Sequence, residues 1–266
     1  MCLIIHKPAG VEIPAPLIRM AWEDNNDGAG IMYHPPGAAG ATVIKLLPKE
    51  VTDPTGHLIA RLKELQELEV GVHFRWKTHG PIDKQNTHPY PLPGGSGWLM
   101  HNGIIAPTTL GPQYNSVRDF MSDTGFYVVS TLQGAPGADD TAFWEIVGQD
   151  VGSYNKMLIL DSAGRFLRVN DKQWEDYKGL RLSNIMSCPE YSTGMSKWWR
   201  GHSIDYSNEY PDMGTARRAD EEPMADIIEV VIGTESAPAR LTRRERKVMN
   251  ACLRSGNWGP FRRMTR

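Results

Sequence analysis

The chain lacks the features that mark several large classes of protein. Three cysteines in 266 residues are too few for a disulfide framework and form no paired CxxC metal site. The eight histidines do not pair at the spacing of metal ligands, so we expect no metal and no cofactor. No P-loop is present, and no GxGxxG turn follows a predicted strand, so the sequence does not indicate a nucleotide-binding domain.

Long apolar runs are also missing. No stretch approaches the roughly 18 apolar residues of a membrane-spanning helix, and we expect no membrane contact. The apolar run near the N-terminus ends before Pro8 and is too short for a signal peptide. Together with the few cysteines, these absences favour a cytoplasmic protein.

The chain as a whole has no large excess of either charge, but its C-terminal segment is strongly basic. The net charge is −2, yet residues 240–266 hold nine Lys or Arg and one Glu, a net of +8, which leaves −10 on residues 1–239. This segment has the charge to contact nucleic acid. We favour a simpler interpretation, in which a helix beginning at Thr242 packs its apolar side on the core and exposes its arginines.

Hydrophobic patterns predict helices and strands without regular β–α–β alternation, which favours an α+β fold. The clearest helix begins at Asp53-Pro54, where the aspartate caps free N–H groups and proline takes the first helical position. The long polar loop over 77–97 is of a kind that is usually functional. The other predicted elements are strands over 2–6, 31–33, 42–47, 70–76, 98–105 and 126–132, a short helix over 116–122, and a hairpin of 154–160 with 165–170.

We expect three regions along the chain. The first is a main domain over residues 1–190. A polar linker with a short strand follows over 191–239, where prolines and glycines interrupt any pattern. The last is a basic helix and tail over 240–266.

The most informative residue present is the cysteine at position two. Removal of Met1 would make Cys2 the first residue, with a thiol and a free α-amine on one residue. A thiol is a good nucleophile only as thiolate, and an α-amine with a reference pKa of about 7.7–8.0 can take its proton. Cys2 alone can therefore supply nucleophile and base, although many cytosolic chains begin Met-Cys without such a role.

Four short motifs follow Cys2. They are Arg75-Trp76-Lys77-Thr78-His79-Gly80, Asn86-Thr87-His88-Pro89, His101-Asn102-Gly103 and Ser122-Asp123-Thr124, and an Asp/Gly turn at residues 26–30 precedes them. With Cys2, the set resembles the class II glutamine amidotransferases, a family of N-terminal-nucleophile hydrolases, over residues 2–190. The resemblance implies a four-layer αββα sandwich of two antiparallel sheets.

The resemblance also implies a reaction and its participants. Cys2 would attack the side-chain amide of free L-glutamine, ammonia would leave, and water would hydrolyse the thioester to glutamate. Arg75 would bind the α-carboxylate and Asp123 the α-ammonium, roles that suit a forked guanidinium and a carboxylate. The side-chain amide of Asn102 and the backbone N–H of Gly103 would form an oxyanion hole.

Three further residues are expected to shape the pocket, namely Thr78, His79 and His88, with Thr78 as a glutamine ligand. Neither histidine is needed as a base if the α-amine fills that role. Outside this context, Asn102-Gly103 would indicate a hairpin turn, and Arg75 or Asp123 an ordinary surface charge.

Three positions depart from the family pattern. Leu3 stands where glycine is frequent, Lys77 where alanine or proline is usual, and Gly125 where an acidic residue is frequent. None of these changes removes a reacting group.

About 75 residues follow position 190, too few for the synthase domains that accept ammonia in the family. We therefore expect a stand-alone glutaminase, similar to short bacterial and bacteriophage members, that supplies ammonia to a separate acceptor enzyme. Two alternatives remain open: an N-terminal-nucleophile amidohydrolase acting on another amide, and a catalytically silent interaction protein on the same fold.

Overall fold

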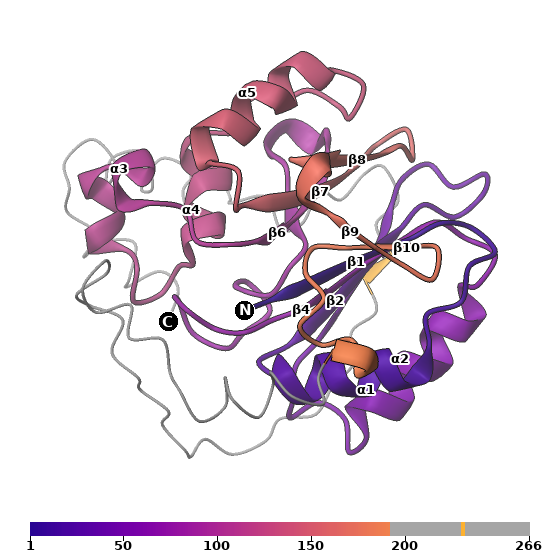
Figure 1. The fold of residues 1–266 in the computed structure, drawn as a ribbon. Coiled ribbons are helices and arrows are strands. Elements are labelled where there is room, and N and C mark those ends of the chain that lie inside the picture. The colour runs from indigo at the N-terminus through magenta and orange to yellow at the C-terminus, as the bar shows by residue number, and fades with distance from the viewer. Residues whose placement is uncertain (192–229, 232–266) are drawn as a thin grey trace.

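The computed structural model describes residues 1–191 and 230–231, and every structural statement below concerns these residues. The elements form two antiparallel sheets with helices on both outer sides (Figure 1). Most of the predicted linker over 191–239 and the whole basic segment over 240–266 lie outside the described residues. Within the described part of the chain, no helix has the length and apolarity needed to cross a membrane.

The larger sheet has seven strands in the order β11-β3-β2-β4-β1-β10-β9. Their bounds are β1 (Leu3–Lys7), β2 (Ala29–Tyr33), β3 (Thr42–Leu46), β4 (Val70–Phe74), β9 (Glu175–Tyr177), β10 (Leu180–Leu182) and β11 (Val230–Val231). Strand β1 lies between β4 and β10, with Leu3 opposite Phe74 and Ile5 opposite Leu182. The start of the chain is therefore held in the interior of a sheet.

The smaller sheet has four strands in the order β5-β6-β7-β8. Their bounds are β5 (Tyr90–Pro91), β6 (Gly97–Asn102), β7 (Lys156–Asp161) and β8 (Phe166–Val169). Strands β7 and β8 are the predicted hairpin, which is confirmed, with Leu160 opposite Phe166. The hairpin turn is fixed by Asp161, whose carboxylate accepts hydrogen bonds from the N–H groups of Ala163 and Arg165.

Five α-helices and three short 3₁₀ turns are described. The helices are α1 (Ala15–Asp24), α2 (Pro54–Glu64), α3 (Pro107–Leu110), α4 (Asp123–Ser130) and α5 (Thr141–Val151), and the turns are Pro93–Gly95, Pro112–Ser116 and Asp171–Gln173. The predicted start of α2 is confirmed: Pro54 is its first residue and Asp53 Oδ1 accepts a hydrogen bond from Gly56 N at 2.8 Å.

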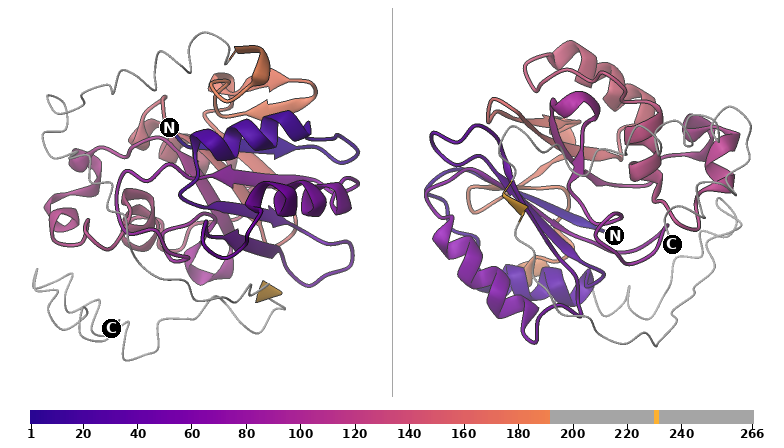
Figure 2. Two further views of the ribbon diagram at one scale, coloured as in Figure 1. Left: turned by 90° about the horizontal axis from the view of Figure 1, so that it is seen from below. Right: turned by 180° about the vertical axis from the view of Figure 1, so that it is seen from behind.

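The layers follow from the alternation of side chains along each strand. Leu3 and Ile5 of β1 pack with residues of α1 and α2, whereas Ile4 points to the other sheet. In β6, Leu99 packs with α4 and α5, whereas Met100 faces the larger sheet. Figure 2 shows α1 and α2 together on one outer face. The expected four-layer αββα sandwich is confirmed.

The structure of residues 123–130 differs from the prediction made from the sequence. The apolar run over 126–132 was predicted as a strand, and the structure has helix α4 there. Phe126, Tyr127 and Val128 are all buried, so the helix has no polar side to reveal its period. Ser122 begins the helix by accepting a hydrogen bond from Gly125 N. The predicted helix over 116–122 is also wrong, because the Pro112–Ser116 turn ends there and α4 begins later.

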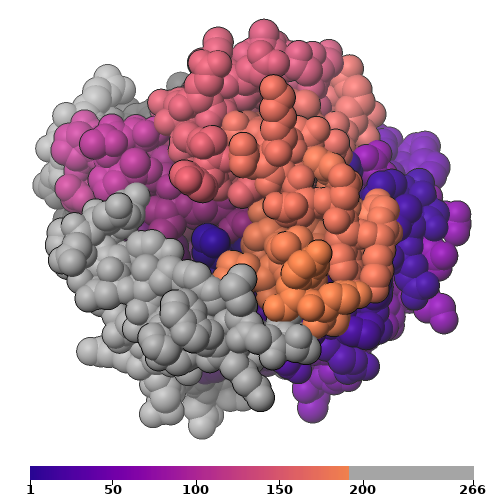
Figure 3. Space-filling view, viewed as in Figure 1, coloured from indigo at the N-terminus to yellow at the C-terminus, as the bar shows by residue number. Residues whose placement is uncertain are grey.

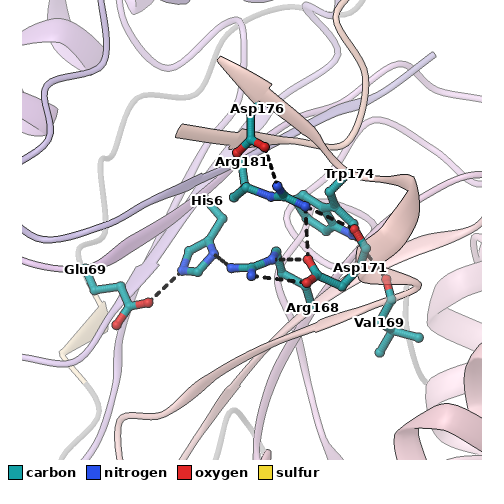
Figure 4. Close-up of polar contacts among 8 residues, drawn as sticks. All are labelled: His6, Glu69, Arg168, Val169, Asp171, Trp174, Asp176 and Arg181. Atoms are coloured by element: carbon teal, nitrogen blue, oxygen red, sulfur yellow. Dashed lines mark hydrogen bonds and ion pairs between the residues drawn. The ribbon is translucent and has the colours of Figure 1, made fainter. Parts of the chain in front are cut away.

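A polar cluster joins the two sheets at the far end of β1 (Figure 4). His6 of β1 bonds Glu69 through Nε2 at 2.7 Å, and its Nδ1 lies 2.7 Å from Arg168 Nη1 of β8. A guanidinium only donates, so Nδ1 must accept and the proton sits on Nε2. Asp171 connects Arg168 to Arg181 of β10, which fastens the smaller sheet to the larger one.

Lys7 fixes the same end of β1. Its side chain is 1% exposed, and its ammonium donates to the carbonyl oxygens of Pro8, Gln66 and Leu68 at 2.6–3.0 Å. Two of these oxygens also accept backbone hydrogen bonds, Gln66 O from Gly10 N and Pro8 O from Val11 N, so Lys7 adds a charged donor to a turn that is already ordered. Lys7 therefore stabilises the fold at a distance from Cys2, which precedes the other end of the strand.

Candidate active site

Cys2 lies immediately before β1 and beside the end of β4. The register of these strands, with Leu3 opposite Phe74, brings Cys2 next to Trp76. The Cys2 sulfur accepts a hydrogen bond from Trp76 N at 3.2 Å and donates to Trp76 O at 3.4 Å. Residues 74 positions apart in sequence therefore meet because of strand pairing alone.

A small pocket opens beside Cys2. It is lined by Cys2, Arg75, Trp76, Thr78, His79, Asn86, His88, His101, Gly103, Ser122, Asp123 and Thr124. All the predicted site residues except Asn102 are in this lining. Figure 3 shows the indigo N-terminal atoms set back in a hollow between magenta and orange surfaces.

Arg75 is almost fully buried at one wall of the pocket. Its Nη1 donates to Pro81 O at 2.9 Å and its Nη2 to His79 O at 3.1 Å, which folds the following loop over the guanidinium. A guanidinium carries five N–H donors, so these two bonds do not exhaust it. Arg75 therefore orders the loop and still has donors for an anion.

Asp123 supplies the opposite charge at the N-terminus of α4. Its Oδ2 accepts from Ile105 N at 2.9 Å and its Oδ1 from Thr124 N at 2.8 Å. These two backbone donors fix the orientation of the carboxylate at the pocket wall. The pocket thus presents a fixed cation and a fixed anion, a pair that suits a zwitterion.

Gly103 is at a position that only glycine fits. Its φ is +148°, and a Cβ atom there would lie 2.1 Å from Asn155 Oδ1. That oxygen is held in place because it accepts from His101 Nε2 at 2.8 Å. His101 Nδ1 forms a hydrogen bond with the Thr124 hydroxyl at 2.7 Å, and the imidazole thereby connects β6 to α4.

Asn102 is buried beside the pocket and is not part of its lining. Its Nδ2 donates to Ser183 Oγ at 2.9 Å, which uses one of the two amide hydrogens. The sequence motifs contain Asn102 but neither Ser183 nor Asn155, whose side chain supports His101. No local pattern marks Ser183 or Asn155, because their partners lie 81 and 54 residues away in sequence.

Burial raises the pKa of the Cys2 thiol above its ordinary value. The Trp76 N–H, the positive charge at the N-terminus of the chain and Arg75 act in the opposite direction, while Asp123 adds to the increase. The thiol is therefore mostly protonated at neutral pH, and a nucleophilic role requires a nearby group that takes the proton.

Three buried histidines at or beside the pocket, namely His73, His88 and His101, are held neutral. Burial lowers the pKa of His73 to about 3, and it lowers the pKa values of His88 and His101 as well. His73 and His88 stack with ring centroids 4.0 Å apart, an arrangement that two imidazolium cations would not tolerate. Neither ring nitrogen of His88 has a hydrogen-bond partner within the described residues.

We predict that acid destabilises the fold through these histidines. Because the pKa of His73 falls from 6.5 to about 3 on folding, the unfolded chain binds the proton more readily. This contribution to stability is complete above pH 6.5 and is lost as the pH falls from 6.5 toward 3. For His73 the free energy of unfolding should fall by about 2 kcal/mol between pH 7 and pH 5, measured by urea unfolding.

A pair of variants isolates this effect. His73→Asn should flatten the pH dependence over that range, whereas His57→Asn on the surface side of α2 should leave it as in the wild type. An unchanged pH dependence in His73→Asn would show that the acid sensitivity comes from other groups.

Comparison with known proteins gives partial matches. No profile of a known protein family matches the chain. Glutamine–fructose-6-phosphate aminotransferase of Aeropyrum pernix is 27% identical over 167 residues, 57% of this chain and 25% of that protein. The Staphylococcus epidermidis enzyme of the same name is 35% identical over 97 residues, 34% of this chain and 16% of the enzyme.

A solved structure of glutamine phosphoribosylpyrophosphate amidotransferase from B. subtilis is similar with a TM-score of 0.43 at 15% identity. The match covers 70% of this chain and 42% of that one. The chain spans a quarter or less of the length of the two curated relatives. The resemblance inferred from the motifs is confirmed: over the matched part, this chain is a homologue of the class II glutamine amidotransferases.

Proposed function

We propose that the protein hydrolyses the side-chain amide of free L-glutamine through a thioester on Cys2. The observation that carries the proposal is one pocket that joins the Cys2 thiol to a buried guanidinium and a buried carboxylate. Arg75 would hold the α-carboxylate of glutamine and Asp123 its α-ammonium, with Thr78, His79 and His88 completing the wall. A glutamine residue within a peptide lacks both charged groups and would be rejected.

The reaction requires that Met1 be removed. The freed α-amine of Cys2 takes the thiol proton, and the thiolate attacks the side-chain carbonyl carbon. The resulting oxyanion is held by Gly103 N–H and by the second amide hydrogen of Asn102. Collapse breaks the C–N bond, ammonia leaves with the proton from the α-ammonium of Cys2, and water then hydrolyses the thioester to glutamate.

We further propose that a separate synthase accepts the ammonia, as expected from the sequence. Cys2 and Cys188 are both free thiols, which is compatible with the proposed reducing, cytoplasmic location. The acceptor is tested by isolating the protein from its native lysate. A chain that migrates alone with full glutaminase activity would contradict a stable acceptor complex.

The glutaminase proposal is tested by covalent labelling. A glutamine analogue carrying a diazoketone in place of the amide should modify an N-terminal Cys2, and excess L-glutamine should protect it. Mass spectrometry of the labelled peptide identifies the residue and shows whether Met1 is present. Failure to label Cys2 in a protein that also releases no ammonia from glutamine would favour the silent interaction protein.

A further inference from the structure

Ser183 and Asn184 follow β10 and reach the elements that carry the proposed reaction. Strand β10 pairs with β1 so that Ile5 is opposite Leu182. This register places Ser183 beside Ile4 and directs the next residue toward Cys2. Ser183 is 1% exposed, and its N–H donates to Ile4 O at 2.9 Å.

The hydroxyl oxygen of Ser183 links the two sheets. It accepts from Ile4 N at 2.8 Å and from Asn102 Nδ2 at 2.9 Å. A hydroxyl oxygen has two acceptor lone pairs, so both bonds form together. One atom thereby sets the distance between β1, which carries the nucleophile, and the end of β6, which carries the proposed oxyanion donors.

The hydrogen bond from Asn102 to Ser183 also fixes the orientation of the Asn102 side-chain amide. The amide group is planar, so holding one hydrogen of Nδ2 on Ser183 determines where the other hydrogen points. Donors of an oxyanion hole act through their preset orientation, because no energy is then spent on reorganisation during the reaction. Ser183 therefore controls the plane of the Asn102 amide without itself lining the pocket.

Asn184 holds the backbone of Cys2. Its Nδ2 donates to Cys2 O at 2.8 Å, and its Oδ1 accepts from Met186 N at 3.0 Å. Cys2 precedes the first residue pair between β1 and β4, so strand pairing does not hold its carbonyl group. Asn184 supplies that restraint, and it fixes the residue that bears both the thiol and the α-amine.

We propose that Ser183 and Asn184 are positioning residues, which align the Asn102 amide and the Cys2 backbone for attack on the amide carbon. The inference rests on the proposed glutaminase function. It adds Ser183 and Asn184 to the residues proposed for the reaction. Both lie about 80 positions beyond the Asn102-Gly103 motif and are identified only by their contacts in the structure.

The test is steady-state kinetics of ammonia release from glutamine by the full chain. Ser183→Ala should lower kcat about 10- to 100-fold, because a misaligned oxyanion donor loses much of its effect. KM should change less than about threefold, since the wall formed by Arg75 and Asp123 is intact. In the Asn102→Ala background, the same Ser183→Ala change should cost less than about threefold, because Ser183 acts through that amide.

The control for lost stability is Lys7→Met, at the opposite end of the same strand. It removes a buried group that donates to three carbonyls and should lower the melting temperature while leaving kcat unchanged. If Ser183→Ala does not fold, Asn184→Asp carries the test. It keeps the shape and the acceptor for Met186 N but replaces the donor to Cys2 O by a carboxylate oxygen that repels it, and should lower kcat at least about fivefold.

The outcomes separate the two proposals. A wild-type protein that releases no ammonia contradicts the glutaminase function itself. An active wild type with unchanged kcat in a folded Ser183→Ala or Asn184→Asp overturns the positioning roles. An equal loss from Ser183→Ala with and without Asn102 shows that Ser183 acts only through general stability, which also overturns its role.

Discussion

Cys2→Ala is expected to abolish glutamine hydrolysis, lowering kcat by at least about 10⁴-fold. The change removes the only atom that forms a covalent bond to the substrate in the proposed mechanism. His73 and His88 stack on each other, and both ring nitrogens of His101 have hydrogen-bond partners. Ammonia release at saturating glutamine measures the loss, and calorimetry should still detect glutamine binding because Arg75 and Asp123 remain.

Cys188→Ala is the matched control. Cys188 is the other free cysteine of the described chain, fully buried in the core that contains Leu3. Burial raises its pKa to about 11, so it is protonated at neutral pH and unreactive. Its loss should cost about 1 kcal/mol of stability and no activity. Residual hydrolysis by Cys2→Ala above one part in about 10³ would point to a nucleophile other than Cys2.

Local chemistry made part of the fold predictable from the sequence. The Asp53-Pro54 start of α2 and the turn at Asp161 each depend on contacts within a few residues, and both are confirmed. The two-sheet arrangement came from the family resemblance. The spacing of strands alone indicated only an α+β fold, because it contains no information on which strands pair.

The sequence did not reveal several of the elements, and for some of them the physical cause is clear. Helices α1 and α5 were not predicted, and α4 was taken for a strand. In α4 nearly every side chain is buried, so tertiary packing replaces the polar side that reveals a helix. Strands β9 and β10 have three residues each, too few to show an alternating pattern.

The site, like the fold, contains residues that local motifs reveal and residues that only tertiary contacts reveal. The motifs that contain Arg75, Gly103 and Asp123 located residues that the structure brings into one pocket. Ser183 and Asn184 could not be found in this way, because their roles exist only once β10 pairs with β1. A serine and an asparagine in sequence have many ordinary roles, and only a partner 81 or 182 residues away distinguishes these two.

Gly103→Ala is expected to lower kcat about 10²- to 10³-fold, the usual effect of losing one oxyanion donor. A Cβ atom at this position would overlap Asn155 Oδ1, which His101 holds from the other side. The backbone must therefore move, and with it the N–H that the mechanism directs at the oxyanion. Steady-state kinetics measures the loss, and KM should change little because the charged wall is unaltered.

Gly10→Ala separates this effect from backbone strain. Gly10 also has a positive φ, at +75°, but a Cβ atom there would meet nothing within 4 Å. Both variants place a side chain at a positive φ, which costs about 1 kcal/mol at Gly10. The cost is larger at Gly103, where the Cβ atom also meets Asn155 Oδ1, and urea unfolding measures both losses. Only Gly103→Ala disturbs the proposed oxyanion hole, so only it should lose activity per folded molecule. A folded Gly103→Ala with kcat within threefold of the wild type would show that this N–H does not stabilise the oxyanion, and Asn102 would then be the sole proposed donor.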